Sequence, residues 1–162
     1  MASTSIELRR RSLLALVGVA ACVPAFSAKA QAPVPLDVWK DPSCGCCQDW
    51  VSHLQARGFA VRVHEGGNEA MRSRLRIDPR YGACHTATVG GYAIEGHVPA
   101  ADIHRLLREK PVAIGLAVPG MPVGAPGMDG AVYGSRSDAF DVLLLSRDGQ
   151  ASVFGKYPRN RA

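Results

Sequence analysis

The sequence predicts a small α/β domain in which a βαβ unit is followed by a ββα unit and an added C-terminal β-hairpin. Short alternating or apolar runs mark the strands, and the segments between them have the spacing of helices. In addition, three of the five cysteines lie where the first predicted strand gives way to the first helix. Residues 31–162 are long enough for one domain with its own core, so cysteines are not needed merely to hold the fold together.

Residues 1–30 have the pattern of an export signal. The basic cluster Arg9–Arg11 precedes an apolar run over residues 13–21, which is too short to span a bilayer. Ala28-Lys29-Ala30 then offers small residues at a signal-peptidase site, so we expect cleavage before Gln31. The mature chain is expected in the periplasm, with no transmembrane span.

Two alternatives concerning this signal remain open. Residues 10–14 also resemble a twin-arginine signal, which exports folded proteins, so the sequence does not decide between the Sec and the twin-arginine route. Val19-Ala20-Ala21-Cys22 resembles a lipoprotein cleavage box, in which Cys22 carries a lipid anchor.

The basic character of the whole chain comes largely from this signal. The net charge is +5, but residues 1–30 hold four of the 19 Lys and Arg and one of the 14 Asp and Glu. The remainder has 15 basic against 13 acidic residues, a net charge of +2. Because no long basic run lies in this remainder, a nucleic-acid partner is not expected.

The first half of the mature chain is predicted to form β–α–β. A short strand over 36–39 ends at Asp41-Pro42-Ser43, which supplies cap-type residues for a helix. That helix is predicted over 46–57, and four residues at i, i+3, i+4, i+7 spacing define its buried face: Cys47, Trp50, Val51 and Leu54. Residues 59–64 alternate between apolar and polar, which favours an edge strand.

The second half is predicted to form β–β–α after a short helix over 69–77. The inward side chains of this short helix are expected to be Met71 and Leu75. An i, i+4 series of arginines is expected on a solvated face: Arg72, Arg76 and Arg80. Two strands over 86–89 and 92–95 flank a Gly-Gly turn, and a further helix is predicted over 99–110.

This order of elements, with cysteines at the start of the first helix, is the plan of a small thioredoxin-like fold. In that fold the first strand is central and the second lies at an edge. Residues 111–130 then form a Gly/Pro-rich loop in which Pro-Gly-Met occurs twice, ending at Met121 and at Met128. The runs 140–146 and 151–154 predict the added hairpin.

Cys44 and Cys47 form a C-x-x-C pair at the predicted helix start, where the helix dipole and free amide groups favour thiolate. Such a pair can shuttle between dithiol and disulfide. Cys46 adds a third thiol, from which an oxidoreductase gains little. Thiolates and thioethers together select Cu(I) among the common biological metals, and clustered thiolates can bridge several ions. Redox chemistry and copper binding therefore both remain open.

In thioredoxin-like proteins the loop before the third strand faces the cysteine motif, usually through a cis-proline followed by Thr. Here Thr86 holds the strand position and His85 replaces the proline, which places Cys84 and His85 opposite Cys44–Cys47. With donors from the later loops, the candidate metal ligands are Cys44, Cys46, Cys47, Cys84, His85, His97, Met121 and Met128. The remaining histidines and the tryptophans are expected to be structural: His53, His64, His104, Trp39 and Trp50.

Four motifs, in this order, resemble the periplasmic copper-resistance family CopG, formerly labelled a domain of unknown function. They are WKDPSCGCC at 39–47, CHTA at 84–87, EGHVPA at 95–100 and GLAVPGMPVGAPGM at 115–128. The resemblance covers about residues 36–157. It implies a thioredoxin-like fold, a cysteine-bridged multinuclear copper site and a role in copper tolerance through interconversion of Cu(I) and Cu(II).

The leading hypothesis is thus an exported copper-binding protein that holds Cu(I), with other periplasmic copper-handling proteins as its partners. One alternative is a periplasmic thiol-disulfide oxidoreductase that uses Cys44 and Cys47. Another is a structural zinc site with four cysteines, or with three cysteines and a histidine, as ligands. If the protein is an enzyme, it is expected to be a copper or thiol oxidoreductase.

Overall fold

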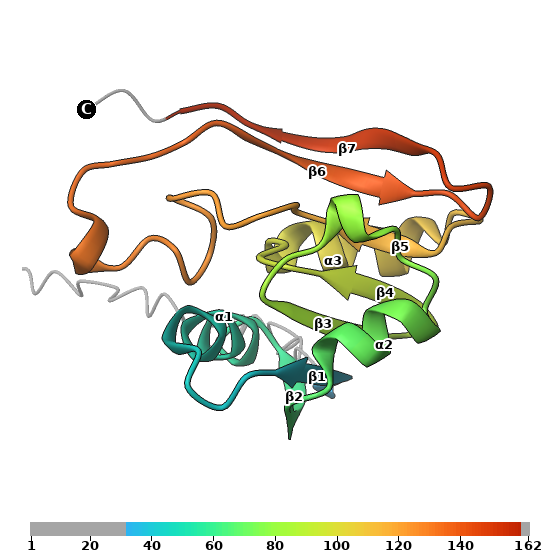
Figure 1. The fold of residues 1–162 in the computed structure, drawn as a ribbon, viewed down its shortest axis with the longest axis horizontal. Helices are drawn as coiled ribbons and strands as arrows, with labels where there is room; N and C mark the ends of the chain where they lie inside the picture. Colours follow the sequence, from blue (N-terminus) through green and yellow to red (C-terminus); the bar gives the residue numbers. More distant parts are fainter. Residues whose placement is uncertain (1–31, 160–162) are drawn as a thin grey trace, which may run out of the picture. The chain divides into compact units, whose positions relative to one another are not determined.

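The structure is a computed structural model that describes residues 32–159. In this part the chain has a mixed α/β fold with three α-helices and one seven-stranded sheet (Figure 1). The strands are β1 (Val34–Lys40), β2 (Phe59–Glu65), β3 (His85–Val89), β4 (Tyr92–Glu95), β5 (Gly115–Ala117), β6 (Phe140–Leu145) and β7 (Ala151–Tyr157). The helices are α1 (Gly45–Gln55), α2 (Asn68–Arg74) and α3 (Ala100–Glu109), with short 3-10 turns η1 (Pro79–Tyr81) and η2 (Ala131–Tyr133).

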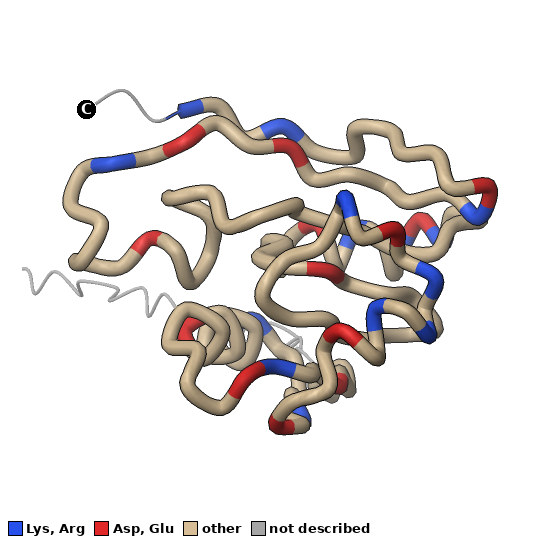
Figure 2. Tube along the Cα trace, in the orientation of Figure 1, with Lys and Arg blue, Asp and Glu red and all other residues tan. Residues whose placement is uncertain are grey.

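The predicted export signal, including Cys22, lies outside the described residues. Among residues 32–159, no helix is long and apolar enough to cross a membrane. Charged residues of both signs alternate along most of this part, but the stretch 111–128 carries none (Figure 2). This uncharged stretch runs beside the candidate site described below.

The order of strands in the sheet is β2-β1-β3-β4-β5-β6-β7. β1 is parallel to β2 and antiparallel to β3, and β3 is antiparallel to β4. The predicted inner position of the first strand and edge position of the second are therefore confirmed. The register pairs Trp39 with Thr86 and Lys40 with His85. The start of β3 consequently lies beside the end of β1, from which the chain runs into the cysteine motif.

The main core lies between the sheet and the helices α1 and α3. The helices contribute buried side chains at helical spacing: Trp50, Val51, Leu54, Ile103 and Leu106. The sheet contributes alternate residues such as Leu36 and Val38, because successive side chains of a strand point to opposite faces. Cys47 is also buried, so the predicted inner face of the first helix is confirmed.

Two expectations about the second helix are wrong. The helix ends three residues earlier than residue 77 and buries none of its side chains, so Met71 is only partly covered. Leu75, which follows the helix, does pack against a core cluster, as expected. Arg76 has a φ of 59°, which is incompatible with continuing the helix. Arg72 does not lie on a solvated face, since its side chain is 14% exposed and pairs with Glu95 of β4. Helical spacing could not reveal this partner, because it comes from a distant strand.

Residues 111–130 are not entirely a loop, because β5 lies within them. β5 pairs with β4 in parallel and with β6 in antiparallel orientation, so it joins the hairpin to the rest of the sheet. Its three residues are all small or apolar and show no alternation, which is why the pattern did not predict a strand. The predicted hairpin is confirmed as β6 and β7.

Candidate metal centre

The turn before α1 positions the cysteine motif. The Asp41 carboxylate accepts hydrogen bonds from the Ser43 backbone N–H at 2.8 Å and from its hydroxyl at 2.5 Å. The Asp41 carbonyl accepts a hydrogen bond from the Cys44 N–H at 3.1 Å. Cys44 is the N-cap residue of α1, and Cys46 and Cys47 follow in the first turn. All three sulfurs therefore lie near the amino end of the helix, where its dipole favours thiolates.

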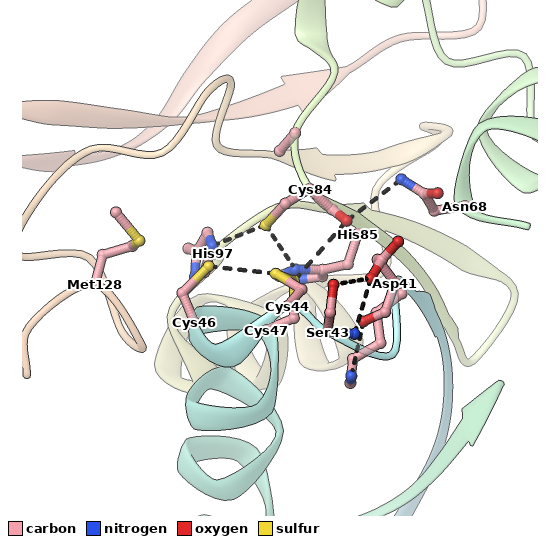
Figure 3. The surroundings of a disulfide bond; sticks show 12 residues. Asp41, Ser43, Cys44, Cys46, Cys47, Asn68, Cys84, His85, His97 and Met128 are labelled. Carbon is pink, nitrogen blue, oxygen red and sulfur yellow. Dashed lines mark hydrogen bonds between the residues drawn. A yellow bond between two sulfur atoms is a disulfide. The ribbon is translucent and has the colours of Figure 1, made fainter. Parts of the chain in front are cut away.

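The sulfur atoms of four cysteines form one group, which we call the sulfur group (Figure 3). Its members are Cys44, Cys46, Cys47 and Cys84, and all their Sγ atoms lie within 4.8 Å of one another. Cys44 and Cys47 form a disulfide with a Cα–Cα distance of 5.4 Å, whereas Cys46 and Cys84 are free. Cys46 Sγ is 3.4 Å from Cys44 Sγ. The structure thus brings Cys84 to the motif, while metal binding by these residues stays a prediction.

Two histidines also contact Cys84. Its Sγ is 3.1 Å from Nε2 of His97 and 3.4 Å from Nδ1 of His85. The Pro126 carbonyl lies 2.9 Å from Nδ1 of His97. Because a carbonyl can only accept, Nδ1 carries the proton and Nε2 presents its lone pair to Cys84. The donor atoms of Cys84, His85 and His97 lie within 4.8 Å of one another, so Cys84 belongs to two groups of candidate ligands.

Burial sets the protonation of this region. It lowers the pKa of both His85 and His97 from the usual range, so both imidazoles are neutral, which is the form that binds a metal. The ring of His85 lies against Trp50 with the centroids 4.2 Å apart. Burial raises the pKa of Cys84 to about 12, and the adjacent Cys46 contributes to the shift. In the metal-free protein Cys84 is therefore a thiol.

A buried ion pair holds the segment that carries Cys84. Oε1 of Glu95 accepts hydrogen bonds from Nε of Arg72 at 2.8 Å and from the Ala83 N–H at 2.7 Å, and Oε2 accepts one from the Thr86 hydroxyl at 2.7 Å. Arg72 also donates to the Ala83 carbonyl at 2.6 Å. Burial raises the pKa of the Glu95 carboxyl, and these donors oppose that shift. The sequence analysis did not predict the Arg72–Glu95 pair. The one signal for it was the carboxylate of Glu95 at the end of a buried strand.

The Gly/Pro-rich loop lies against α1 next to Cys46. Met128 is 6% exposed, packs with Cys46 and accepts a hydrogen bond from the Tyr133 hydroxyl at 3.2 Å (Figure 3). Gly127 permits this close approach, because it has a φ of +83° and its missing Cβ would lie 2.6 Å from the Cys46 carbonyl oxygen. The same Cβ would lie 2.7 Å from the backbone nitrogen of Trp50.

Met121 occupies a different position from Met128. It is 54% exposed. It lines an open cleft of about 410 Å³ together with Cys84 and Arg72. One predicted methionine therefore lies in the small apolar cluster against which Cys46 packs, and the other lines a cleft that reaches Cys84.

The three remaining histidines make structural contacts, as predicted. Nε2 of His53 accepts a hydrogen bond from the Ala100 N–H at 3.2 Å, at the start of α3, which has no side-chain cap of its own. Burial lowers the pKa of His53 to about 4, which keeps this acceptor unprotonated at neutral pH. His104 donates to a backbone carbonyl, and His64 stacks on Trp39. None of the three belongs to the groups of candidate ligands found within residues 32–159.

A mixed α/β domain in which four cysteine sulfurs and two neutral imidazoles converge has the donor set of a protein that binds soft or borderline metal ions. Two solved structures of a copper resistance protein, CopG, are similar to the chain. One, labelled form 2, is 50% identical with a TM-score of 0.72, and the match covers 78% of this chain and 99% of that chain. The other, form 1, is 51% identical with a TM-score of 0.72, and the match covers 78% and 98%.

The chain belongs to the CopG family of copper resistance proteins, which confirms the resemblance found in its sequence. A family model described as "Protein of unknown function, DUF411" matches residues 81–128, the part that contains Cys84, both buried histidines and both loop methionines. A search of the curated proteins found no match.

Proposed function

We propose that the chain is an exported copper-binding protein of copper resistance, which holds Cu(I) at the sulfur group. The observation that carries this proposal is the convergence of four sulfurs within 4.8 Å. Metal–thiolate bonds of about 2.3 Å separate two sulfurs on one tetrahedral ion by about 3.8 Å. The Cys44–Cys46 separation of 3.4 Å is close to this value. Reduction of the Cys44–Cys47 disulfide adds two thiols to the free thiols of Cys46 and Cys84, so that four cysteines can bind metal as thiolates.

The surroundings of the sulfur group favour several bound ions. Four thiolates in one place can be shared between ions, which gives a cysteine-bridged cluster. Met128 adds a soft thioether beside Cys46, and Met121 offers a second one at the cleft that leads to Cys84. Other periplasmic copper-handling proteins can exchange Cu(I) through this cleft.

The mixture of donors also supports cycling between Cu(I) and Cu(II). Thiolates and thioethers select Cu(I), whereas imidazole suits copper in either oxidation state. Cys84 lies within 3.4 Å of nitrogen atoms of both His85 and His97. A copper ion beside Cys84 therefore has both kinds of ligand within reach, which is what an ion that changes oxidation state requires.

Anaerobic loading of the reduced chain with Cu(I), followed by native mass spectrometry, tests the proposal. We expect more than one copper per chain and loss of most of it in the Cys46→Ser/Cys47→Ser variant. His104→Asn is the control, because His104 lies outside both groups of candidate ligands. Less than one copper per chain, or equal losses in variant and control, would contradict copper binding at this site.

A second candidate function is thiol-disulfide exchange, favoured by the Cys44–Cys47 disulfide at the start of α1. Against it, His85 stands where a cis-proline is expected, and no cis peptide bond occurs in the part of the chain that the structure describes. This function predicts activity on reduced substrates that copper chelators do not affect. A structural zinc site is the third reading, and zinc that co-purifies and resists displacement by Cu(I) would favour it.

A further inference from the structure

We propose that the chain has a second metal site, formed by Cys84, His85 and His97, which remains available when Cys44 and Cys47 form their disulfide. This site shares Cys84 with the sulfur group but does not depend on Cu(I) binding by the reduced chain. The second site binds a single borderline divalent cation rather than a cluster of Cu(I) ions. The redox state of the Cys44–Cys47 pair then decides which kind of metal the protein holds.

The distances fit one ion. A metal with a thiolate at about 2.3 Å and an imidazole nitrogen at about 2.0 Å separates the two donors by about 3.5 Å at a tetrahedral angle. Cys84 Sγ lies 3.1 Å from Nε2 of His97 and 3.4 Å from Nδ1 of His85. The three donor atoms are thus spaced as ligands of one ion before any ion is bound.

The surroundings of the two imidazoles also suit metal binding. The hydrogen bond from Nδ1 of His97 to the Pro126 carbonyl leaves the Nε2 lone pair facing Cys84, which is the usual second-shell arrangement of a metal-binding histidine. His85 is 0% exposed, and its Nε2 has no hydrogen-bond partner among the described residues. The nitrogen of His85 that faces Cys84 is Nδ1, at 3.4 Å, so Nδ1 and not Nε2 is its candidate ligand atom.

The disulfide removes two of the sulfur donors but leaves this second group intact. Cys44 and Cys47 cannot act as thiolates in the disulfide form, whereas Cys84 is free, as is Cys46, whose sulfur lies within 4.8 Å of it. One or two thiolates with two imidazoles suit borderline ions such as Zn²⁺, Co²⁺ and Cu²⁺, while an all-thiolate set suits Cu(I). Oxidation of the pair thus changes the metal preference from a soft monovalent to a borderline divalent ion.

The test uses the full chain in its disulfide form. Anaerobic treatment with glutathione disulfide converts the two thiols to the protein disulfide and releases two molecules of glutathione. Thiol counting should then show two fewer free thiols than in the reduced chain. Titration with cobalt(II) chloride, which does not oxidise thiols, reports binding through sulfur-to-cobalt charge transfer and tetrahedral ligand-field bands.

We expect one Co²⁺ per chain, and a Kd at least about tenfold higher in His97→Asn and in Cys84→Ser. His104→Asn is the matched control and should leave the Kd unchanged, since His104 stacks on Phe59 and bonds a backbone carbonyl, outside both groups of candidate ligands. Circular dichroism identifies a variant that fails to fold, in which case the other variant decides. The Cys44→Ser/Cys47→Ser chain, which cannot form the disulfide, should also bind one Co²⁺.

Absence of Co²⁺ binding in the disulfide form overturns the second site. So does binding that neither His97→Asn nor Cys84→Ser weakens. Cu(I) loading of the reduced chain is a separate measurement. If that loading fails while Co²⁺ binds the disulfide form, the proposed function is wrong and the second site stands. If the reduced chain loads Cu(I) but the disulfide form does not bind Co²⁺, the second site is wrong and the proposed function stands.

Discussion

Replacing Glu95 by Gln is predicted to lower the free energy of unfolding of the metal-free protein by about 3 kcal/mol. Glu95 is 0% exposed, and each of its partners donates to it. Gln keeps an oxygen for Arg72 and Ala83, and the Thr86 hydroxyl can turn to accept from its amide. The decrease in the free energy of unfolding therefore comes mainly from removal of the negative charge opposite Arg72, whose side chain is only 14% exposed. Removing one partner of a buried pair costs about 3–5 kcal/mol, and the retained oxygen places this variant at the lower end.

Urea denaturation with linear extrapolation measures this change. Asp78→Asn is the matched control, because Asp78 pairs with Arg80 at 3.5 Å on the surface, where the two side chains are 47% and 56% exposed. Its expected effect is below about 1 kcal/mol. The double variant Arg72→Gln/Glu95→Gln should recover part of the loss, since it removes the unpaired charge. A loss for Glu95→Gln no larger than that of the control would refute the reasoning.

Three further predictions concern the loop, pH and air. Gly127→Ala should lower the free energy of unfolding by about 1–3 kcal/mol, because the new Cβ meets the backbone of α1 at a positive φ. Gly130→Ala, with open space and a φ of −71°, should stay within about 0.5 kcal/mol, and equal effects would contradict the close approach. His53 is neutral in the folded protein down to a pKa of about 4, so its contribution to stability is full above pH 6.5 and is lost as the pH falls from 6.5 towards 4. Urea denaturation across this pH range should show a smaller loss in the free energy of unfolding for His53→Gln than for the wild type, because Gln keeps an acceptor for the Ala100 N–H but does not titrate. Identical pH profiles for the two chains would contradict the role of His53 as the acceptor at the start of α3. Air oxidation of the metal-free chain should lower its Cu(I) capacity, and reduction should restore it; unchanged free-thiol counts after exposure to air would contradict this.

Local periodicity predicted most of the fold. The spacing of Cys47, Trp50, Val51 and Leu54 correctly gave the buried face of α1, and alternation over 59–64 correctly placed β2 at an edge. β5 was missed because three small or apolar residues carry no periodic signal, so only pairing with β4 and β6 makes them a strand. Arg72 was misplaced because its partner Glu95 lies on another element, and one-dimensional spacing cannot report such a pairing.

The site could be predicted where topology alone determines proximity. Since β3 runs antiparallel beside β1, the residues before β3 must lie near those after β1, and this brought Cys84 and His85 to the cysteine motif. The loop contacts could not be predicted in the same way. The Pro126 carbonyl that orients His97, and the different exposures of Met121 and Met128, depend on how an irregular segment packs.

The most direct test of copper binding at the sulfur group is an anaerobic Cu(I) competition titration of the reduced Cys46→Ser chain beside the His104→Asn chain. Cys46 is not part of the C-x-x-C pair, so a thiol-disulfide oxidoreductase does not need it, whereas a thiolate cluster does. We predict fewer bound Cu(I) ions and weaker binding for Cys46→Ser, and the wild-type values for His104→Asn. Wild-type stoichiometry and affinity in the Cys46→Ser chain would contradict the account.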